Sequence, residues 1–253
     1  MLFRSVGFLL NSLTFLGTLG GTQAQLGDTA GLAQTLERVR VAGARLTKAV
    51  PAGTVRALLA DEGGRILDSL NFLMQGNPTQ SQRAGREAAM HLEHATVEGG
   101  SDRQLRDSLL GTVYGFLAMA DLELADYPAA EVAARAALEH RRAADPPGAI
   151  GTQRDLNEAI AWLAAALARQ GKPEEARTLL APAVKFQREL VARNKTDAWL
   201  HFEMARVLYA QAAAEPARRA ALLKEAAAQI AASPPAVAAT PIVAWLRHLI
   251  ARA

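Results

Sequence analysis

A short turn recurs along this chain and separates runs of apolar residues that repeat at helical intervals. Its clearest copy is Gly171-Lys172-Pro173 in the stretch ARQGKPEEARTLLAPAV, and related turns surround Gly27, Gly76 and Ala125. These four positions are spaced by 49, 49 and 46 residues, and a looser break follows 41 residues further on, near Ala212. Because each turn both follows and precedes an apolar run, the chain is constrained to fold as a series of helical hairpins.

The residues at these turns have the backbone preferences that a helix end and a helix start require. Gly27, Gly76 and Gly171 can adopt the positive φ with which many helices end. A proline follows both Gly76 and Gly171 by two residues, where its fixed φ suits the first turn of the next helix. Glu174 and Glu175 then lie at the positive end of that helix dipole. The turns therefore predict where each helix stops and where the next begins.

Apolar residues within the hairpins follow a helical period, and the composition suits close packing of helices. Ile160, Leu163 and Leu167 fall at i, i+3 and i+7 of one predicted helix. Half of the residues are apolar but only 5% are aromatic, so small and aliphatic side chains carry the hydrophobic content. Small Ala164 and Ala176 would let two helices approach closely. We therefore expect an all-α fold.

Charge and cysteine content exclude several classes of protein. The formal net charge is only +3, from 28 basic and 25 acidic residues spread along the chain, so no nucleic-acid-binding surface is expected. Most of the basic residues are arginine, which together with the abundant alanine is typical of a GC-rich bacterial gene. The absence of cysteine excludes disulfides, thiolate catalysis and cysteine-ligated metal sites.

Catalytic motifs are also missing from the sequence. It has no phosphate-binding P-loop, no dinucleotide-binding glycine motif after a strand, no zinc-protease motif and no nucleophile elbow. We therefore expect neither an enzyme nor a bound cofactor. Glu87, His91 and His94 come nearest to a metal site, because their spacing puts all three on one helix face. Three such residues on a surface helix are common by chance, so metal binding is a remote alternative.

The pattern of turns and helices resembles the tetratricopeptide repeat (TPR), whose consensus is W-x2-L-G-x2-Y, then A-x3-F, then a proline. The matching positions are Tyr114, Leu117, Ala118 and Ala130 in one unit, Leu16, Leu19, Gly20 and Leu36 in another, and His201, Met204, Ala205 and Leu208 near the C-terminus. The chain thus resembles a divergent member of the TPR superfamily over most of its length. Its period exceeds the usual one of about 34 residues, which indicates longer helices.

This resemblance implies a right-handed α-solenoid of about five antiparallel helix hairpins, which would occupy residues 10–230. Residues 231–241 form a Pro-rich linker in this interpretation, and residues 242–253 form a C-terminal capping helix. A cap is expected because a terminal repeat otherwise exposes its apolar face. A helix that forms a dimer or lies on a membrane surface is the alternative. The residues that share one face of this helix are Ile242, Trp245, Leu246, Leu249 and Ile250.

The N-terminal segment, residues 1–9, has three interpretations. It can belong to a secretory signal, because the first 24 residues contain an apolar run and end in the small-residue site Thr22-Gln23-Ala24. It can also be the start of the first repeat helix, or a sequencing-adapter scar at residues 2–5. A genuine signal would place the protein in the bacterial periplasm, and otherwise the cytoplasm is favoured. No membrane span is expected, because a span needs about 20 mostly apolar residues and Asn11 interrupts this run.

The resemblance also implies a function. In TPR proteins the first helices of successive hairpins line a concave groove that holds a peptide or a partner helix, so we expect a non-catalytic protein–protein interaction scaffold. The alternative is a regulatory or sensory C-terminal part of a larger bacterial signalling protein of the kinase or cyclase type. The partner and the oligomeric state stay open. The predicted groove residues are Met119, Leu122, Glu123, Glu158, Arg169, Trp199, Phe202, Arg206 and Tyr209, although the aromatic ones could equally pack between hairpins.

Overall fold

The computed structural model describes residues 2–144 and 150–253, and within them it confirms the all-α fold. Eleven helices of twelve or more residues and one single-turn helix are present in this described part. None of these helices is both long and apolar enough to span a membrane. They are α1 (Leu2–Leu26), α2 (Thr29–Thr47), α3 (Val55–Met74), α4 (Pro78–Glu93), α5 (Gly100–Glu123), α6 (Tyr127–Ala144), α7 (Ile150–Arg169), α8 (Pro173–Arg193), α9 (Ala198–Ala214), α10 (Arg219–Ala231), α11 (Pro235–Ala238) and α12 (Pro241–Arg252).

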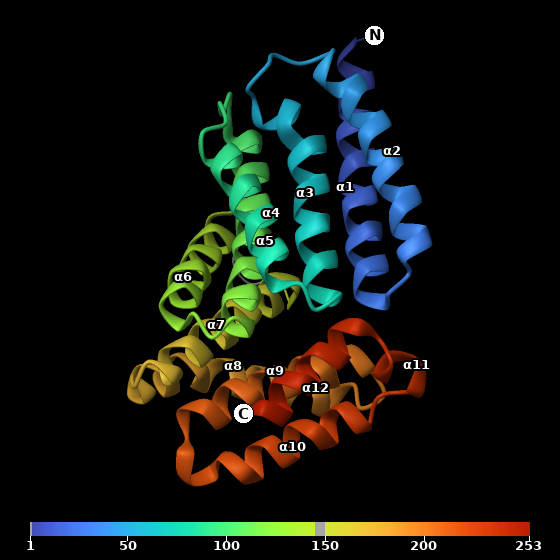
Figure 1. Cartoon of the computed structure of the whole chain (residues 1–253). Helices are drawn as coiled ribbons and strands as arrows, with labels where there is room; N and C mark the ends of the chain where they lie inside the picture. Colours follow the sequence, from blue (N-terminus) through green and yellow to red (C-terminus); the bar gives the residue numbers. More distant parts are fainter. Residues whose placement is uncertain (1, 145–149) are drawn as a thin grey trace.

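Neighbouring helices along the chain pack against each other from α1 to α10 (Figure 1). The odd-numbered helices also pack on one another, α1 on α3, α3 on α5, α5 on α7 and α7 on α9. Helices α2, α4, α6, α8 and α10 make no comparably extensive contacts among themselves within the described residues. The odd-numbered helices from α1 to α9 thus form one layer. We call the surface of α1, α3, α5, α7 and α9 that faces away from the even-numbered helices the inner face.

The four predicted turns share one backbone arrangement. Gly27, Gly76 and Gly171 adopt positive φ angles of 74°, 75° and 77°, as predicted, and Ala125 adopts 58°. In each turn the next N–H donates to the carbonyl five residues earlier, which is the Schellman motif that closes a helix end. These bonds join Asp28 to Gln23, Asn77 to Phe72, Asp126 to Asp121 and Lys172 to Leu167, at 2.9 to 3.0 Å.

Two of the predicted breaks depart from the glycine pattern. Ala125 is the only residue other than glycine with positive φ in the described chain. An L-residue in this conformation costs roughly 1–2 kcal/mol, which the adjacent helices must offset. The break predicted near Ala212 lies slightly later, since α9 ends at Ala214 and a short 3₁₀ turn, Pro216–Arg218, leads into α10. That connection contains no residue with positive φ.

Close helix packing depends on small side chains at the contact positions. Ala164 of α7 and Ala176 of α8 are both fully buried, as their predicted role in a close approach requires. At Gly111 of α5, an added Cβ would meet the Cγ of Arg141 at 2.8 Å. Helices α5 and α6 therefore touch at a point that leaves no room for a larger residue.

Replacing glycine with alanine should lower the stability of the fold at a turn and raise it inside a helix. At Gly171 a Cβ meets no atom within 4 Å, so only the positive φ penalises Gly171→Ala. We expect this change to lower the free energy of unfolding by about 1 kcal/mol. Gly64→Ala in α3, where a Cβ also meets no atom, should raise it by about 0.5–1 kcal/mol. Urea unfolding of both variants measures this, and effects of the same sign would contradict the turn assignment.

Candidate functional site

Helix α12 lies on the inner face as well as at the end of the helix series. It packs against α9 and α10, as a capping helix would, but it also packs against α1 and α3. Figure 1 shows it below the ends of α1 and α3 and above α10. It therefore bridges the first and last parts of the helix series. Its buried side chains are Ile242, Val243, Trp245, Leu246, Leu249 and Ile250.

Three kinds of contact hold α12 in this position. The indole rings of Trp245 and Trp162 meet edge to face, with ring centroids 5.4 Å apart, a geometry that aromatic pairs favour. Near the C-terminus, Arg252 Nη1 donates to Glu123 Oε1 at 2.8 Å. At the other end, the ring of Pro241 lies so close to Gly27 that a Cβ there would meet Pro241 Cγ at 2.9 Å. The helix is thus fixed at both ends and in the middle.

A largely buried charge cluster, with Arg206 at its most enclosed point, lies next to α12 between α7 and α9. Arg206 Nη1 donates to Glu158 Oε1 at 2.9 Å, and Arg141 Nη2 lies 3.5 Å from the other carboxylate oxygen. The Arg206 guanidinium also stacks near two rings, 5.6 Å from the centroid of Trp162 and 5.7 Å from that of Phe202. Burial raises the pKa of Glu158, but Arg206 and Arg141 outweigh it and hold the pKa below its ordinary value. Glu158 is therefore ionised at neutral pH.

A second ion pair and a small cavity adjoin this cluster. Arg154 and Glu203 face each other in a bidentate arrangement, with Nε 3.0 Å from both carboxylate oxygens. The cavity has a volume of about 240 Å³. Gln25 of α1 and Ile242 of α12 contribute to its lining, so segments distant in sequence close it. The two ion pairs therefore hold their charged groups in a fixed geometry beside this cavity.

The structure brings together about half of the predicted groove residues. Glu158, Trp199, Phe202 and Arg206 line the 240 Å³ cavity with Ile242 of α12. The rings of Trp199 and Phe202 pack edge to face, with centroids 5.9 Å apart. These residues come from α7 and α9, the two helices that the resemblance placed side by side. In this conformation they face α12.

The other predicted groove residues have different surroundings. Met119 and Leu122 are buried in the main core between helices. Tyr209 is also buried, which raises the pKa of its hydroxyl, and Arg169 beside it counteracts that effect. Glu123 pairs with Arg252 of α12. These five predicted groove residues, Arg169 included, therefore make contacts within the chain.

The three residues weighed as a metal site have separate partners. His91 Nδ1 lies 2.8 Å from Glu62 Oε1 of α3, and His94 Nδ1 donates to the Met90 carbonyl at 2.7 Å. Glu87 forms ion pairs with neighbouring arginines. Among the described residues, no group of three or more acidic, histidine or cysteine side chains is arranged to hold a metal ion.

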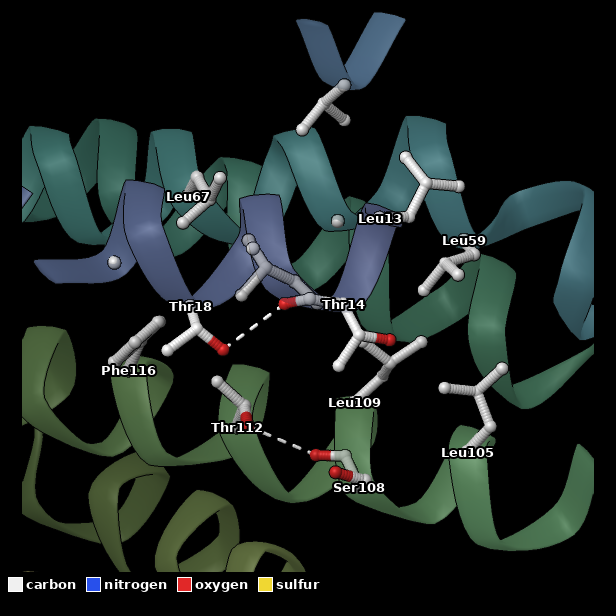
Figure 2. A pocket seen from close by; sticks show the side chains of 15 residues that line it. Leu13, Thr14, Thr18, Leu59, Leu67, Leu105, Ser108, Leu109, Thr112 and Phe116 are labelled. Carbon is white, nitrogen blue, oxygen red and sulfur yellow. Dashed lines mark hydrogen bonds between the residues drawn. The ribbon is translucent and has the colours of Figure 1, made fainter. Parts of the chain in front are cut away.

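A second hollow on the inner face lies between α1, α3 and α5, and the sequence analysis missed it. We call it the slot; its volume is about 270 Å³. Figure 2 shows Thr14 and Thr18 of α1 opposite Ser108 and Thr112 of α5. The stripe of small and hydroxyl residues along α1, which includes Gly17, was the available signal. It could not reveal the slot alone, because α1, α3 and α5, with Val39 of α2, together form the lining.

Comparisons with protein-family models, with curated proteins and with solved structures find no match to this chain. The assignment of a role therefore rests on the inner face, the placement of α12 and the slot.

Replacing Glu158 with Gln should destabilise the fold in a pH-dependent way. Because the folded-state pKa lies below the ordinary 4.5, the stabilising contribution of Glu158 is complete above that pH. It is lost as the pH falls through the folded-state pKa. We expect Glu158→Gln to cost roughly 3 kcal/mol near neutral pH, because the buried Arg206 loses its charged partner. The difference in the free energy of unfolding between wild type and Glu158→Gln should shrink below pH 4.5. Urea unfolding at several pH values measures this difference, and a difference that stays constant would refute the prediction.

Glu62 provides a control, because its contribution to stability should change with pH in the opposite direction. Burial in α3 raises the pKa of its carboxyl from 4.5, and the nearby His91 and Arg65 only partly offset this. The contribution of Glu62 to stability is therefore complete below pH 4.5 and is lost as the pH rises through the raised pKa. The stability of wild type relative to Glu62→Gln should fall as the pH rises. The same slope for both variants would show that the pKa directions are wrong.

Proposed function

We propose that this chain is a non-catalytic scaffold that binds an amphipathic helix of a partner protein on its inner face. In this proposal the helix series is a divergent TPR-like α-solenoid, and the inner face corresponds to its concave groove. The contacts among odd-numbered helices and the four Schellman turns support it. The alternative of a regulatory part of a larger signalling protein stays a prediction, because no observation favours it.

The observation that carries this proposal is the docking of α12. This helix presents one apolar face to the scaffold, with Trp245 against Trp162, and a basic residue near its C-terminus, Arg252, to Glu123. A surface that holds one amphipathic helix through aromatic packing and an ion pair can hold another with the same features. The expected partner segment therefore has an aromatic anchor at mid-helix and a cation two turns later.

A partner helix can bind the inner face only where α12 has left it. Because α12 is tethered to the rest of the chain, the partner and α12 compete for the same surface. The segment between α10 and α12, residues 232–240, is only nine residues long and contains two prolines and four alanines, so α12 stays near its site at a high effective concentration. A partner helix must therefore bind more tightly than α12 does alone, or α12 must be weakened. The occupied inner face thus limits binding to strong or abundant partners.

A peptide of residues 241–253 offers a direct test. The full chain with Leu246→Ala should bind the labelled peptide at least tenfold more tightly than wild type, because truncating a fully buried leucine typically costs about 2–5 kcal/mol and weakens the competing helix. Fluorescence anisotropy measures the binding. A control peptide with Glu at positions 246 and 249 should not bind.

Charge reversal on the scaffold completes this test. Glu123→Arg in the Leu246→Ala background should weaken peptide binding several-fold, because it repels Arg252 of the peptide. Glu189→Arg on α8, a matched change at an exposed position, should leave binding unchanged. Equal binding of the two peptides, no binding by the folded Leu246→Ala chain, or equal effects of both charge reversals would each refute the proposal.

A further inference from the structure

The slot between α1, α3 and α5 exists because α1 and α5 both pack on α3 without extensive contacts to each other. Side chains such as Leu67 of α3 form its floor, and those of α1 and α5 form its walls (Figure 2). It lies apart from the residues that hold α12, since the residues that line it do not include Glu123, Trp162 or any residue of α12. It therefore calls for an explanation separate from helix binding.

The lining of the slot is chemically uniform. Large apolar side chains dominate it, and none of the lining residues carries a charge or a side-chain amide. Its polar groups are hydroxyls, and three of them already donate to carbonyls of their own helices: Thr14 to Leu10, Thr18 to Thr14 and Thr112 to Ser108. Their oxygens retain lone pairs that can accept a hydrogen bond from a ligand.

Size and shape restrict the ligand further. At about 270 Å³ the slot exceeds the roughly 150 Å³ of an apolar cavity that binds benzene. Its lining extends over residues 13–21 of α1 and 105–116 of α5. These stretches are about 12 and 16 Å long at about 1.5 Å per residue. The ligand that fits is elongated rather than a compact ring.

An extended peptide suits this lining poorly. Each of its residues would bring an N–H and a C=O that need partners, and the slot offers only a few hydroxyls. Burying such groups without partners costs several kcal/mol, at roughly 1–3 kcal/mol each. A hydrocarbon chain carries no such groups and enters at no comparable cost.

We propose that the slot binds an uncharged small molecule with a medium-length alkyl chain and one hydroxyl donor. The chain lies along α1 and α5 over the leucine-rich floor, and the hydroxyl donates to a threonine oxygen on the wall. A carboxylate or ammonium group is disfavoured, because no side chain in the lining neutralises it. This activity goes beyond helix binding and does not depend on it.

Two adjacent glycines of α3 provide a matched test on the full chain. Gly63 lines the slot and Gly64 does not, yet a Cβ at either position meets no atom within 4 Å. Leucine at either site also favours the helix over glycine, so both variants should fold. Gly63→Leu fills the slot, whereas Gly64→Leu leaves it open. Gly17→Leu, which also lines the slot, and Gly7→Leu form a second pair on α1.

The probes are 1-decanol and decanoate, titrated by isothermal calorimetry. We expect one decanol site in wild type, Gly64→Leu and Gly7→Leu, at least tenfold weaker binding in Gly63→Leu and Gly17→Leu, and at least tenfold weaker binding of decanoate. Circular dichroism and thermal unfolding verify that each variant is folded. No decanol binding by wild type, equal binding by the members of either pair, or equal affinity for both probes would overturn the proposal.

Discussion

In the described part of the chain, α5 and α9 are buried on more sides than a single partner helix can cover, and the rest of the structure depends on this constraint. Helix α9 is buried around most of its circumference, from Leu200 to Ala214, and α5 is almost as enclosed. Helix α4, by contrast, buries a single stripe that includes Ala88 and Leu92. The odd-numbered helices therefore need cover on several sides. Neighbouring pairs provide part of it, and over α9 the helix α12 provides more.

The elements of the fold were predictable because their causes are local. Gly27, Gly76 and Gly171 end helices through a backbone conformation that a single residue type favours, and the helical period of the flanking residues is equally local. The amphipathic pattern of α12 likewise predicted a helix. Its position was not predictable, because it depends on contacts such as Glu123 with Arg252, which lie 129 residues apart.

The candidate site was predictable in part for the same reason. Helical register assigned Glu158 and Arg206 to one predicted groove, and the structure brings the two together as an ion pair between α7 and α9. Register alone does not reveal what covers a face, so it left open whether Tyr209 lies in the groove or packs between hairpins, and it did not indicate the contact of Glu123 with α12. The slot was missed entirely, because its lining is spread over four helices and each contributes only glycine, ordinary apolar or hydroxyl residues.

Two parts of one inner face thus differ in chemistry. Near α7 and α9 the face carries aromatic rings and paired charges and is covered by α12, whereas near α1 and α5 it is apolar, uncharged and hollow. In our account the first part binds helices and the second binds a small neutral molecule. Both depend on the odd-numbered helices forming one layer.

Hydrogen exchange of the backbone amides of α12 tests the central claim most directly, because the account requires this helix to be docked on the inner face. Bonded amides in the interior of α12 should be protected within about tenfold of those in α10, and Leu246→Ala should reduce protection in α12 far more than in α3. Exchange of the α12 amides at the rate of an unstructured chain end, with α10 still protected, would contradict the account.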